Sequence, residues 1–321
     1  MSRNTEIGKT GLRVPPLCFG TSGLGSMPGT YGYEVAEERA LATVRVILAM
    51  EDGFLDTSRN YADGRSEARI GKVVREMGGW PVGRILSTKL DRDMDTRGFD
   101  AARARRSFEE SLEALGRDRV EILHLHDPEH SADIDEITRK GGALDELFRI
   151  KEEGLATAVG LAAGRVDVMM PILRDRDFDV LITHNRHTLV NANAAPMIAL
   201  ARERGISVLN AAPYAGGALA KGTAEFPRYV YQDADAETLA PVRAVEEICA
   251  RHGIPAGAAA LQFSMRDPDV ASTICGVSKP ERVAETLEWA AVEIPDALWS
   301  ELAALERSID DPEATRVYNP G

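Results

Sequence analysis

Short apolar runs alternate with longer amphipathic stretches along almost the whole of this 321-residue chain. This alternation indicates parallel strands, because each pair of parallel strands needs a long crossover, usually a helix, to bring the chain back. We expect eight strands, at residues 16–20, 54–56, 85–89, 120–126, 157–160, 180–183, 207–210 and 272–275. We expect the helices at residues 36–50, 66–76, 101–115, 142–153, 166–173, 193–204, 239–252 and 280–290.

Eight strand-helix units favour a (β/α)8 TIM barrel, an α/β fold, over any open sheet. Three additions are expected: a small N-terminal β-hairpin at residues 6–14 that closes the bottom of the barrel, an extra helix at 255–266 before the last strand, and a terminal helix at 295–307. No linker, low-complexity segment or change of composition interrupts the chain. We therefore expect residues 1–321 to form a single domain.

An open dinucleotide-binding sheet is the main alternative fold, because Gly20, Gly23 and Gly25 follow the first expected strand. A GxGxxG motif that starts at Gly23 requires its third glycine at position 28, where it lets the helix approach the strand closely. This chain has Pro28 at that position, and a proline does not allow the same approach. We therefore reject the open sheet.

Charge and cysteine content limit the classes of partner. The chain has 38 basic and 51 acidic residues, a net charge of −13, whereas binding to nucleic acid or an anionic membrane needs a basic face. Its three cysteines (Cys18, Cys249 and Cys275) are widely spaced, which fits a reducing compartment better than a disulfide framework. With no apolar run of membrane-spanning length, we expect a cytoplasmic protein with a small-molecule substrate. No feature of the sequence sets the oligomeric state.

Four chemically complementary residues lie at or just after the carboxyl ends of three successive expected strands: Asp56, Tyr61, Lys89 and His126. Active sites of (β/α)8 barrels are built at this end. A phenol titrates near ~10 in water, and a nearby ammonium lowers that pKa. Lys89 would supply the ammonium and Asp56 would hold Lys89. His126 would either hydrogen-bond the substrate oxygen or share the proton. Together they would form a general acid/base for carbonyl–alcohol interconversion.

His124 and His126 form a His-x-His pair in the fourth expected strand. We interpret them as alternating, with one ring inside the barrel and the other against the helices. The pair also resembles half of a metal site, but the sequence has no further cluster of ligands, and we expect no metal.

The same residues carry a resemblance to the aldo-keto reductase superfamily, which spans nearly the whole chain. The matching motifs are residues 55–61 with 64–67, 87–89, 118–126 and 280–283. The resemblance implies that Asp56, Tyr61, Lys89 and His126 are the catalytic tetrad. It also implies a nicotinamide dinucleotide, bound in an extended pose without a Rossmann motif, with Tyr61 handling the proton while a hydride passes between nicotinamide and substrate carbon.

Carried onto this chain, the resemblance also implies a set of cofactor-binding residues. They are Gly20, Thr21, Asn185, Asn210, Ala212, Pro213, Tyr214, Gly216, Gly217, Gly276, Ser278, Lys279 and Arg282. Several positions depart from the family pattern. The Ser-Asn pair after strand 5 is missing from residues 160–164, an alanine replaces the tyrosine that stacks on the nicotinamide, and Gly276-Val277 replaces a Lys-Ser pair that binds the 2′-phosphate. We expect NAD or NADP, with NAD at least tolerated.

At these positions the chain resembles the aldose 1-dehydrogenases that act on L-fucose, L-galactose or D-arabinose. In that branch, Arg59, Asn60, His187 and Tyr214 would form a polar pocket for substrate hydroxyls. Residues 22–34 and 310–321 are expected to shape this pocket. The resulting prediction is oxidation of a sugar hemiacetal to its lactone. Two alternatives stay open: an NADPH-dependent reductase of aldehydes or ketones with the same tetrad, and a regulatory subunit that binds the nicotinamide cofactor with little turnover.

Overall fold

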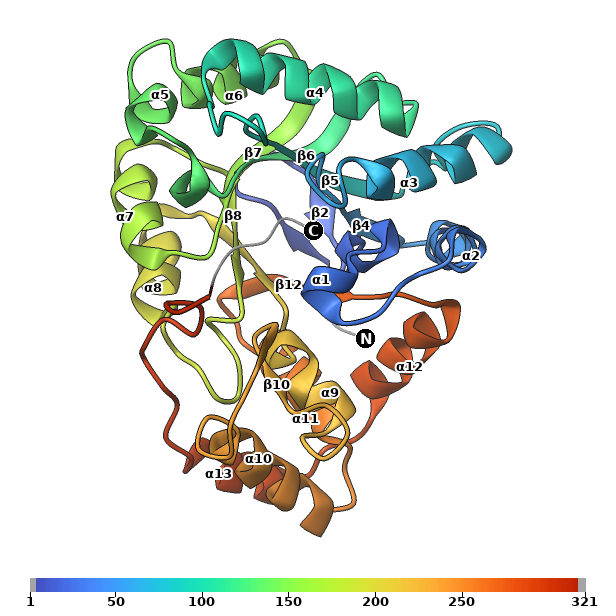
Figure 1. The fold of residues 1–321 in the computed structure, drawn as a ribbon, viewed down its shortest axis with the longest axis vertical. Helices are drawn as coiled ribbons and strands as arrows, with labels where there is room; N and C mark the ends of the chain where they lie inside the picture. Colours follow the sequence, from blue (N-terminus) through green and yellow to red (C-terminus); the bar gives the residue numbers. More distant parts are fainter. Residues whose placement is uncertain (1–3, 317–321) are drawn as a thin grey trace.

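Eight parallel strands close into a barrel in the computed structural model, which describes residues 4–316 (Figure 1). Around the barrel each strand pairs in parallel with both neighbours, and β12 closes the ring between β9 and β3. The strands are β3 (Leu17–Gly20), β4 (Phe54–Asp56), β5 (Ile85–Leu90), β6 (Val120–His126), β7 (Ala156–Ala162), β8 (Val180–His184), β9 (Ser207–Ala211) and β12 (Val270–Gly276). The predicted (β/α)8 fold is confirmed, with each strand displaced by at most a few residues.

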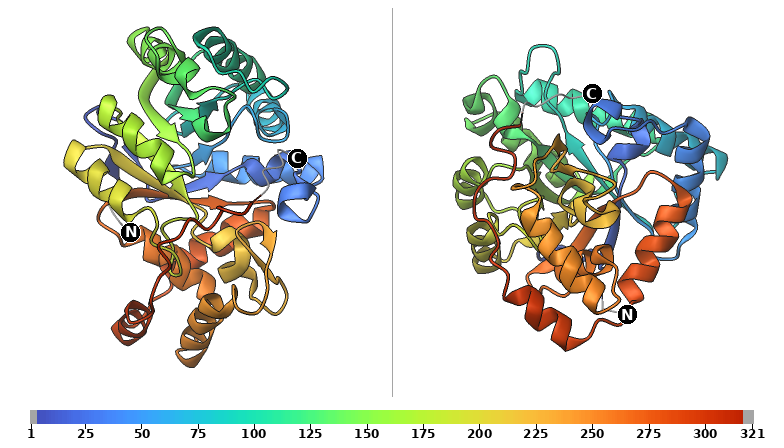
Figure 2. Two further views of the ribbon diagram at one scale, coloured as in Figure 1. Left: turned by 60° about the vertical axis from the view of Figure 1, so that its left-hand side comes forward. Right: turned by 60° about the horizontal axis from the view of Figure 1, so that its bottom comes forward.

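Helices surround the strands on the outside of the barrel (Figure 2). The long helices are α2 (Glu37–Ala49), α3 (Arg65–Glu76), α4 (Ala101–Leu115), α6 (Ala143–Glu152), α7 (Val166–Asp175), α8 (Ala195–Arg204), α10 (Ala240–Arg251), α11 (Ala256–Met265), α12 (Pro280–Ala291) and α13 (Asp296–Ala303). The apolar faces of α2, α3, α4, α6, α7 and α8 pack on the outward side chains of the strands and belong to the largest buried cluster of the molecule. Helices α10, α11 and α13 contribute to a second buried cluster.

Side chains of each strand alternate between the barrel interior and the helix layer. On β6, Ile122 belongs to the interior cluster, whereas Leu123 and Leu125 pack against the helices. His124 and His126 share the parity of Ile122, and both lie inside, so the prediction that they face opposite sides is wrong. The physical reason is the two-residue period of a strand, which puts positions two apart on the same face.

The N-terminal hairpin closes the bottom of the barrel, as predicted. Its strands β1 (Thr5–Glu6) and β2 (Arg13–Val14) pair antiparallel, and Ile7 and Val14 are fully buried in the interior cluster beside Phe54.

The structure exchanges the expected roles of two helices near the last strand. We predicted residues 239–252 as a barrel helix and 255–266 as an addition. In fact α11 packs on the barrel, where Ser264 Oγ hydrogen-bonds both Asn210 Nδ2 (2.8 Å) and Thr273 Oγ1 (2.7 Å). Helix α10 packs outside it, against α11 and α13. The small residues of α11 allow this close approach to the strands, which the more polar α10 does not offer.

Short elements not predicted from the sequence occupy the connections at the carboxyl ends of the strands. They are η1 (Ser22–Gly25), α1 (Pro28–Tyr31), η2 (Pro128–His130), α5 (Ile134–Thr138), η3 (Ala215–Gly217), α9 (Ala218–Lys221), β10 (Arg228–Tyr229) and β11 (Gln232–Asp233). They follow β3, β6 and β9, so they lie where a barrel of this kind builds its site.

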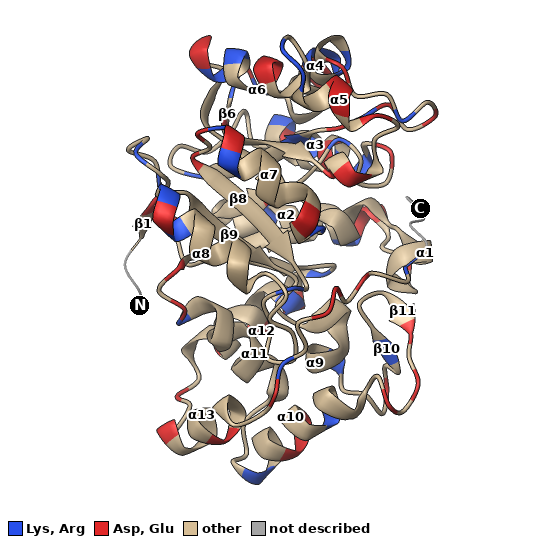
Figure 3. Ribbon diagram, turned by 90° about the vertical axis from the view of Figure 1, so that its left-hand side faces the viewer, with Lys and Arg blue, Asp and Glu red and all other residues tan. Residues whose placement is uncertain are grey.

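The outer surface carries both signs of charge. On the face shown in Figure 3, basic residues lie among acidic ones instead of gathering into one basic surface. Within residues 4–316, no helix combines the length and the apolar character needed to cross a membrane.

The contact between α3 and α4 depends on Gly71. A Cβ added there would lie 1.9 Å from the carbonyl oxygen of Ala114, so the two helices would have to separate. We expect Gly71→Ala to lower the free energy of unfolding by about 1–3 kcal/mol, despite the better helix propensity of alanine. Denaturant unfolding measures this loss. Lys72→Ala, an exposed neighbour on the same helix, is the control, and equal stability of both variants would contradict the prediction.

Candidate active site

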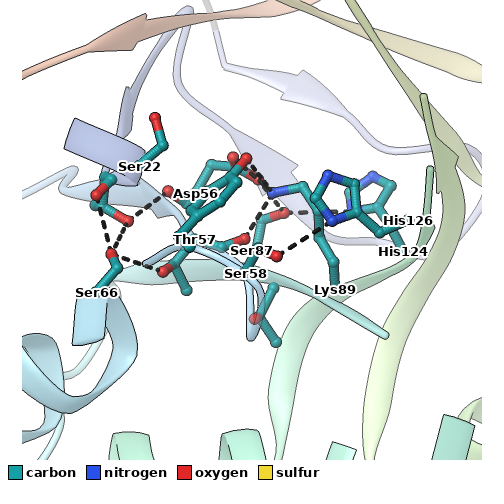
Figure 4. Close-up of polar contacts among 12 residues, drawn as sticks. Ser22, Asp56, Thr57, Ser58, Ser66, Ser87, Lys89, His124 and His126 are labelled. Carbon is teal, nitrogen blue, oxygen red and sulfur yellow. Dashed lines mark hydrogen bonds and ion pairs between the residues drawn. The ribbon is translucent and has the colours of Figure 1, made fainter. Parts of the chain in front are cut away.

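The four predicted catalytic residues converge at the carboxyl end of the barrel. Figure 4 shows three of them, Asp56, Lys89 and His126. Asp56 ends β4, Lys89 is the penultimate residue of β5, and His126 ends β6. Tyr61 lies in the loop after β4. Because the strands are parallel neighbours, their carboxyl ends meet at one rim, and all four side chains line the same cavity.

The ammonium of Lys89 lies inside the barrel with several oxygen partners. Its Nζ is 2.9 and 2.8 Å from the two carboxylate oxygens of Asp56 and donates to the carbonyl oxygen of Thr57 at 2.6 Å. It also donates to the Tyr61 hydroxyl at 3.2 Å. Ser87 Oγ donates to Asp56 at 2.9 Å. Lys89 is only 2% exposed, so its charge is matched by protein groups and not by bulk water.

Tyr61 remains a phenol in this environment. Burial raises its pKa well above the ordinary value, and the nearby Asp56 carboxylate adds to this effect. This differs from our prediction of a lowered pKa. The reason is that Asp56 already matches the Lys89 charge, so little of it is left to favour a phenolate. Tyr61 therefore keeps its proton in this environment, and it lies edge-on to the His126 ring, with 5.9 Å between ring centroids.

His126 lies between two carboxylates. Its Nδ1 is 2.7 Å from Asp91 Oδ1, and its Nε2 is 3.6 Å from Asp127 Oδ1. Burial alone lowers its pKa, but Asp127 and Asp91 outweigh burial, and the pKa lies above its usual value. His124 is different: burial and Lys89 hold its pKa well below the usual value, so this ring is neutral.

The cavity at this rim has a volume of about 850 Å³, a size that suits a cofactor and a small substrate. Besides the tetrad, many of the residues predicted for cofactor or substrate line it. They are Gly20, Asn60, Ala212, Tyr214, Gly216, Gly217, Gly276, Ser278, Lys279 and Arg282.

The other predicted cofactor residues, Thr21, Asn185, Asn210 and Pro213, do not line this cavity. Thr21 Oγ1 donates to the carbonyl oxygen of Asp56 at 3.0 Å, and Asn185 Nδ2 donates to Glu313 at 3.0 Å. Asn210 has the outward parity of β9, and its amide binds the carbonyl oxygen of His187 and Ser264 in the helix layer.

Two predicted substrate residues also point elsewhere. Arg59 lies 3.8 Å from Glu67 and 3.4 Å from Glu110, so its guanidinium faces helices α3 and α4. His187 Nε2 is 2.9 Å from Asp267, and its ring packs on Phe263 outside the barrel. In both cases acidic partners outside the barrel hold the side chain away from the cavity: Glu67 on α3 and Glu110 on α4 for Arg59, and Asp267 in the loop after α11 for His187.

The cavity also has lining residues that the sequence did not single out. They are mainly aromatic or charged, and include Tyr31, Tyr33, Asp127, His184, Lys221, Phe226, Tyr231 and Arg316. Tyr31 and Tyr33 come from the segment 22–34 and Arg316 from 310–321, the two segments expected to shape the pocket. Residues 317–321 of the second segment lie outside the described residues.

Residues 308–316, which we call the 308–316 segment, are bound to the loop after β8 (Figure 1, dark red). Arg186 is 1% exposed and pairs with Asp311 at 2.5 Å and Glu313 at 3.3 Å. Glu313 also contacts His184 at 3.0 Å and Arg316 at 2.9 Å. Although burial raises the pKa of Glu313, its contacts with His184, Arg186 and Arg316 hold it well below the usual range. The segment reaches the cavity through Arg316, which lines it.

Among residues 4–316, no group of three or more His, Cys, Asp or Glu side chains has the arrangement of a metal site. The three cysteines are buried and free.

Comparisons with known proteins agree with this geometry. The sequence model of the Aldo/keto reductase family matches residues 16–307. D-threo-aldose 1-dehydrogenase from Pseudomonas sp. is 29% identical over 318 residues, covering 91% of this chain and 94% of the relative. L-galactose dehydrogenase from Arabidopsis thaliana is 30% identical over 286 residues, covering 88% and 86%. The holo form of an aldo-keto reductase from Bacillus halodurans has the same fold, with a TM-score of 0.78 and 19% identity over 98% of this chain and 99% of that one.

The buried Lys89–Asp56 pair makes a prediction about stability. Lys89→Met leaves the Asp56 carboxylate buried without its counter-charge, and we expect the free energy of unfolding to fall by about 3–5 kcal/mol. Adding Asp56→Asn should recover much of this loss, because neither charge then remains. Denaturant unfolding of both variants measures the coupling. Arg45→Met, which removes one partner of an exposed ion pair, is the control. A double variant no more stable than Lys89→Met would contradict the prediction.

Proposed function

The chain belongs to the aldo/keto reductase family, and from this premise we propose that it is an aldose 1-dehydrogenase that oxidises a sugar hemiacetal to its lactone with NAD(P)+. As a member of this family it is an oxidoreductase acting on CH–OH and carbonyl groups. The sugar is inferred from two relatives named for aldose and galactose oxidation. The observation that carries the proposal is the Tyr61 hydroxyl, held by Lys89 at the cavity with His126 beside it.

Tyr61 is the proposed acid/base. Its hydroxyl faces the cavity and contacts Lys89, so it can exchange a proton with a substrate oxygen placed there. Lys89 and Asp56 hold the phenol in position, since Lys89 Nζ contacts both the Asp56 carboxylate and the Tyr61 hydroxyl. His126 would hydrogen-bond the same substrate oxygen and fix its orientation. We also propose that residues 1–321 act as one domain.

The cavity fits a nicotinamide dinucleotide. Three cationic side chains, Lys221, Lys279 and Arg282, lie near one another at one end of the cavity. Burial and the charges of Arg282 and Lys279 lower the pKa of Lys221. Phosphate groups there would relieve this repulsion. Gly216, with φ +72°, and Gly217 line the cavity beside them; a Cβ on Gly216 would lie 2.7 Å from Val230. When bound, the nicotinamide supplies hydride transfer.

Acidic neighbours reduce the positive charge available to a 2′-phosphate. Arg282 pairs with Glu285 at 2.5 Å, and Arg39 pairs with Glu281 at 2.6 Å. A second phosphate would have to compete with these carboxylates, whereas the 2′-hydroxyl of NAD would not. This supports the use of NAD. Lys279 and Ser278 would contact the phosphates that both cofactors share.

Polar groups at the tetrad end suit a substrate with several hydroxyls. Asn60, Asp127 and His184 line the cavity there, and Ser22 Oγ and the Tyr31 hydroxyl hydrogen-bond each other at 2.5 Å. These groups can accept and donate hydrogen bonds to neutral sugar hydroxyls. They replace Arg59 and His187 in the proposed substrate pocket.

Substitution of the acid/base tests the assignment. We expect Tyr61→Phe to lower kcat by about 10²–10⁴-fold, because the group that exchanges a proton with the substrate oxygen is then missing, while cofactor affinity stays within error. Steady-state absorbance assays and titration of protein fluorescence with NADH measure the two effects. Tyr229→Phe, outside the cavity, is the control. Unchanged turnover in Tyr61→Phe would exclude this role.

A side-by-side assay tests substrate and cofactor. We expect L-fucose, L-galactose or D-arabinose to be oxidised, with higher kcat/KM for NAD+ than for NADP+. Equal or better efficiency with NADP+ would reject the NAD preference. If only simple aldehydes or ketones react, with the reduced cofactors, the protein is a reductase. If the cofactor binds and no substrate on the panel turns over, the regulatory alternative is favoured.

A further inference from the structure

We propose that Asp91 is a positioning residue that keeps the proton on Nδ1 of His126 and turns Nε2 of His126, as the titrating atom, toward the cavity. The inference rests on the proposed function, since it concerns how His126 meets the substrate oxygen. It assigns a role to a residue outside the tetrad.

The backbone of Asp91 is fixed where β5 ends. Its N–H donates to Ser107 Oγ at 2.8 Å, and its carbonyl oxygen accepts from Arg103 Nε at 3.1 Å, so helix α4 holds the residue. The side chain is buried under the rim, with 1% of the residue exposed. Helix α4 therefore fixes the position of Asp91 next to His126.

The contacts of the Asp91 carboxylate determine where protons lie. Oδ2 accepts from Ser58 Oγ at 2.5 Å and from the backbone N–H of Asn60 at 2.9 Å. Oδ1 lies 2.7 Å from His126 Nδ1. Burial raises the pKa of Asp91, but His126 and these donors outweigh it, so the carboxyl is ionised. A carboxylate only accepts, and Nδ1 of His126 must therefore carry the proton.

The second ring nitrogen of His126, Nε2, is then the atom that a substrate oxygen would contact. Nε2 lies 3.6 Å from Asp127, and both residues line the cavity. In the neutral ring Nε2 accepts a hydrogen bond from a hydroxyl, which suits oxidation; in the protonated ring it donates to a carbonyl oxygen, which suits reduction. One titration thus affects both directions of the reaction.

Several elements pack around the His126 ring, and most of them present charged or titratable groups to it. Tyr61 follows β4 and lies edge-on, Lys89 on β5 is matched by Asp56, and β7 presents Ala162, which carries no charge. The other titratable neighbours are Asp91 after β5, His124 on β6, and Asp127 and His130 after it. The two carboxylates are thus the groups here that favour the charged ring, and Asp91 is the one in hydrogen-bond contact.

Asp91→Asn tests the proposal. The N–H of Asn60 needs an acceptor, so the carboxamide oxygen should take the place of Oδ2, and its NH₂ should then face Nδ1. That arrangement forces the proton of the neutral ring onto Nε2. NMR of protein with labelled histidine should report this change of tautomer, with a titration midpoint lower by about one unit or more. His126→Gln identifies the signal among the six histidines.

Kinetics provide the second readout. Neutral His126 in Asp91→Asn would present an N–H instead of a lone pair. We therefore expect kcat for oxidation to fall by about 10²-fold, and the limb of its pH profile that follows the His126 titration to disappear. Asp95→Asn, exposed in the same loop, should leave both readouts unchanged.

The NMR measurement needs no substrate, so it separates this proposal from the proposed function. Wild-type His126 with its neutral proton on Nε2 would overturn the proposal without any variant. An Asp91→Asn protein that loses turnover but keeps the wild-type tautomer and midpoint would also overturn it, because Asp91 would then be only structural. Ser58→Ala, which keeps the carboxylate, should retain the wild-type tautomer.

Discussion

The buried ammonium of Lys89 needs oxygen partners from the protein, and this requirement organises the centre of the molecule. Lys89 contacts Asp56, the Thr57 carbonyl and the Tyr61 hydroxyl, and the cost of removing its charge from water is offset only when all of these lie in place. The barrel provides the rigid frame for this, since β4 and β5 are hydrogen-bonded neighbours. The position of Tyr61 at the cavity is thus coupled to the electrostatics of the fold.

The active site contains two titratable groups of different kinds, the Tyr61 phenol and the His126 imidazole. Burial and carboxylates keep Tyr61 protonated, whereas Asp91 and Asp127 favour a charged His126. The negative groups therefore raise the pKa of both residues, because they disfavour the phenolate of Tyr61 and favour the cation of His126. Both side chains line the same cavity, where a substrate oxygen would meet them.

The sequence predicts the barrel and the tetrad because both depend on local patterns. Strand ends at Asp56, Lys89 and His126 follow from short apolar runs, and parallel pairing brings them together. The direction of Asn210, Arg59 and His187 could not be predicted, since it depends on partners that lie far away in sequence: Ser264 on α11, Glu110 on α4 and Asp267 in the loop after α11. The interior position of both His124 and His126 was available from strand parity alone.

The 308–316 segment has a consequence for biosynthesis. A nascent chain of 300 residues already contains all eight strands and the four rim residues, but it lacks Glu313 and Arg316. Until Asp311 and Glu313 are made, Arg186 has neither of its carboxylate partners, and until Arg316 is made the cavity lacks one of its lining side chains. Completion of the pocket therefore requires residues that are synthesised only after all eight strands of the barrel.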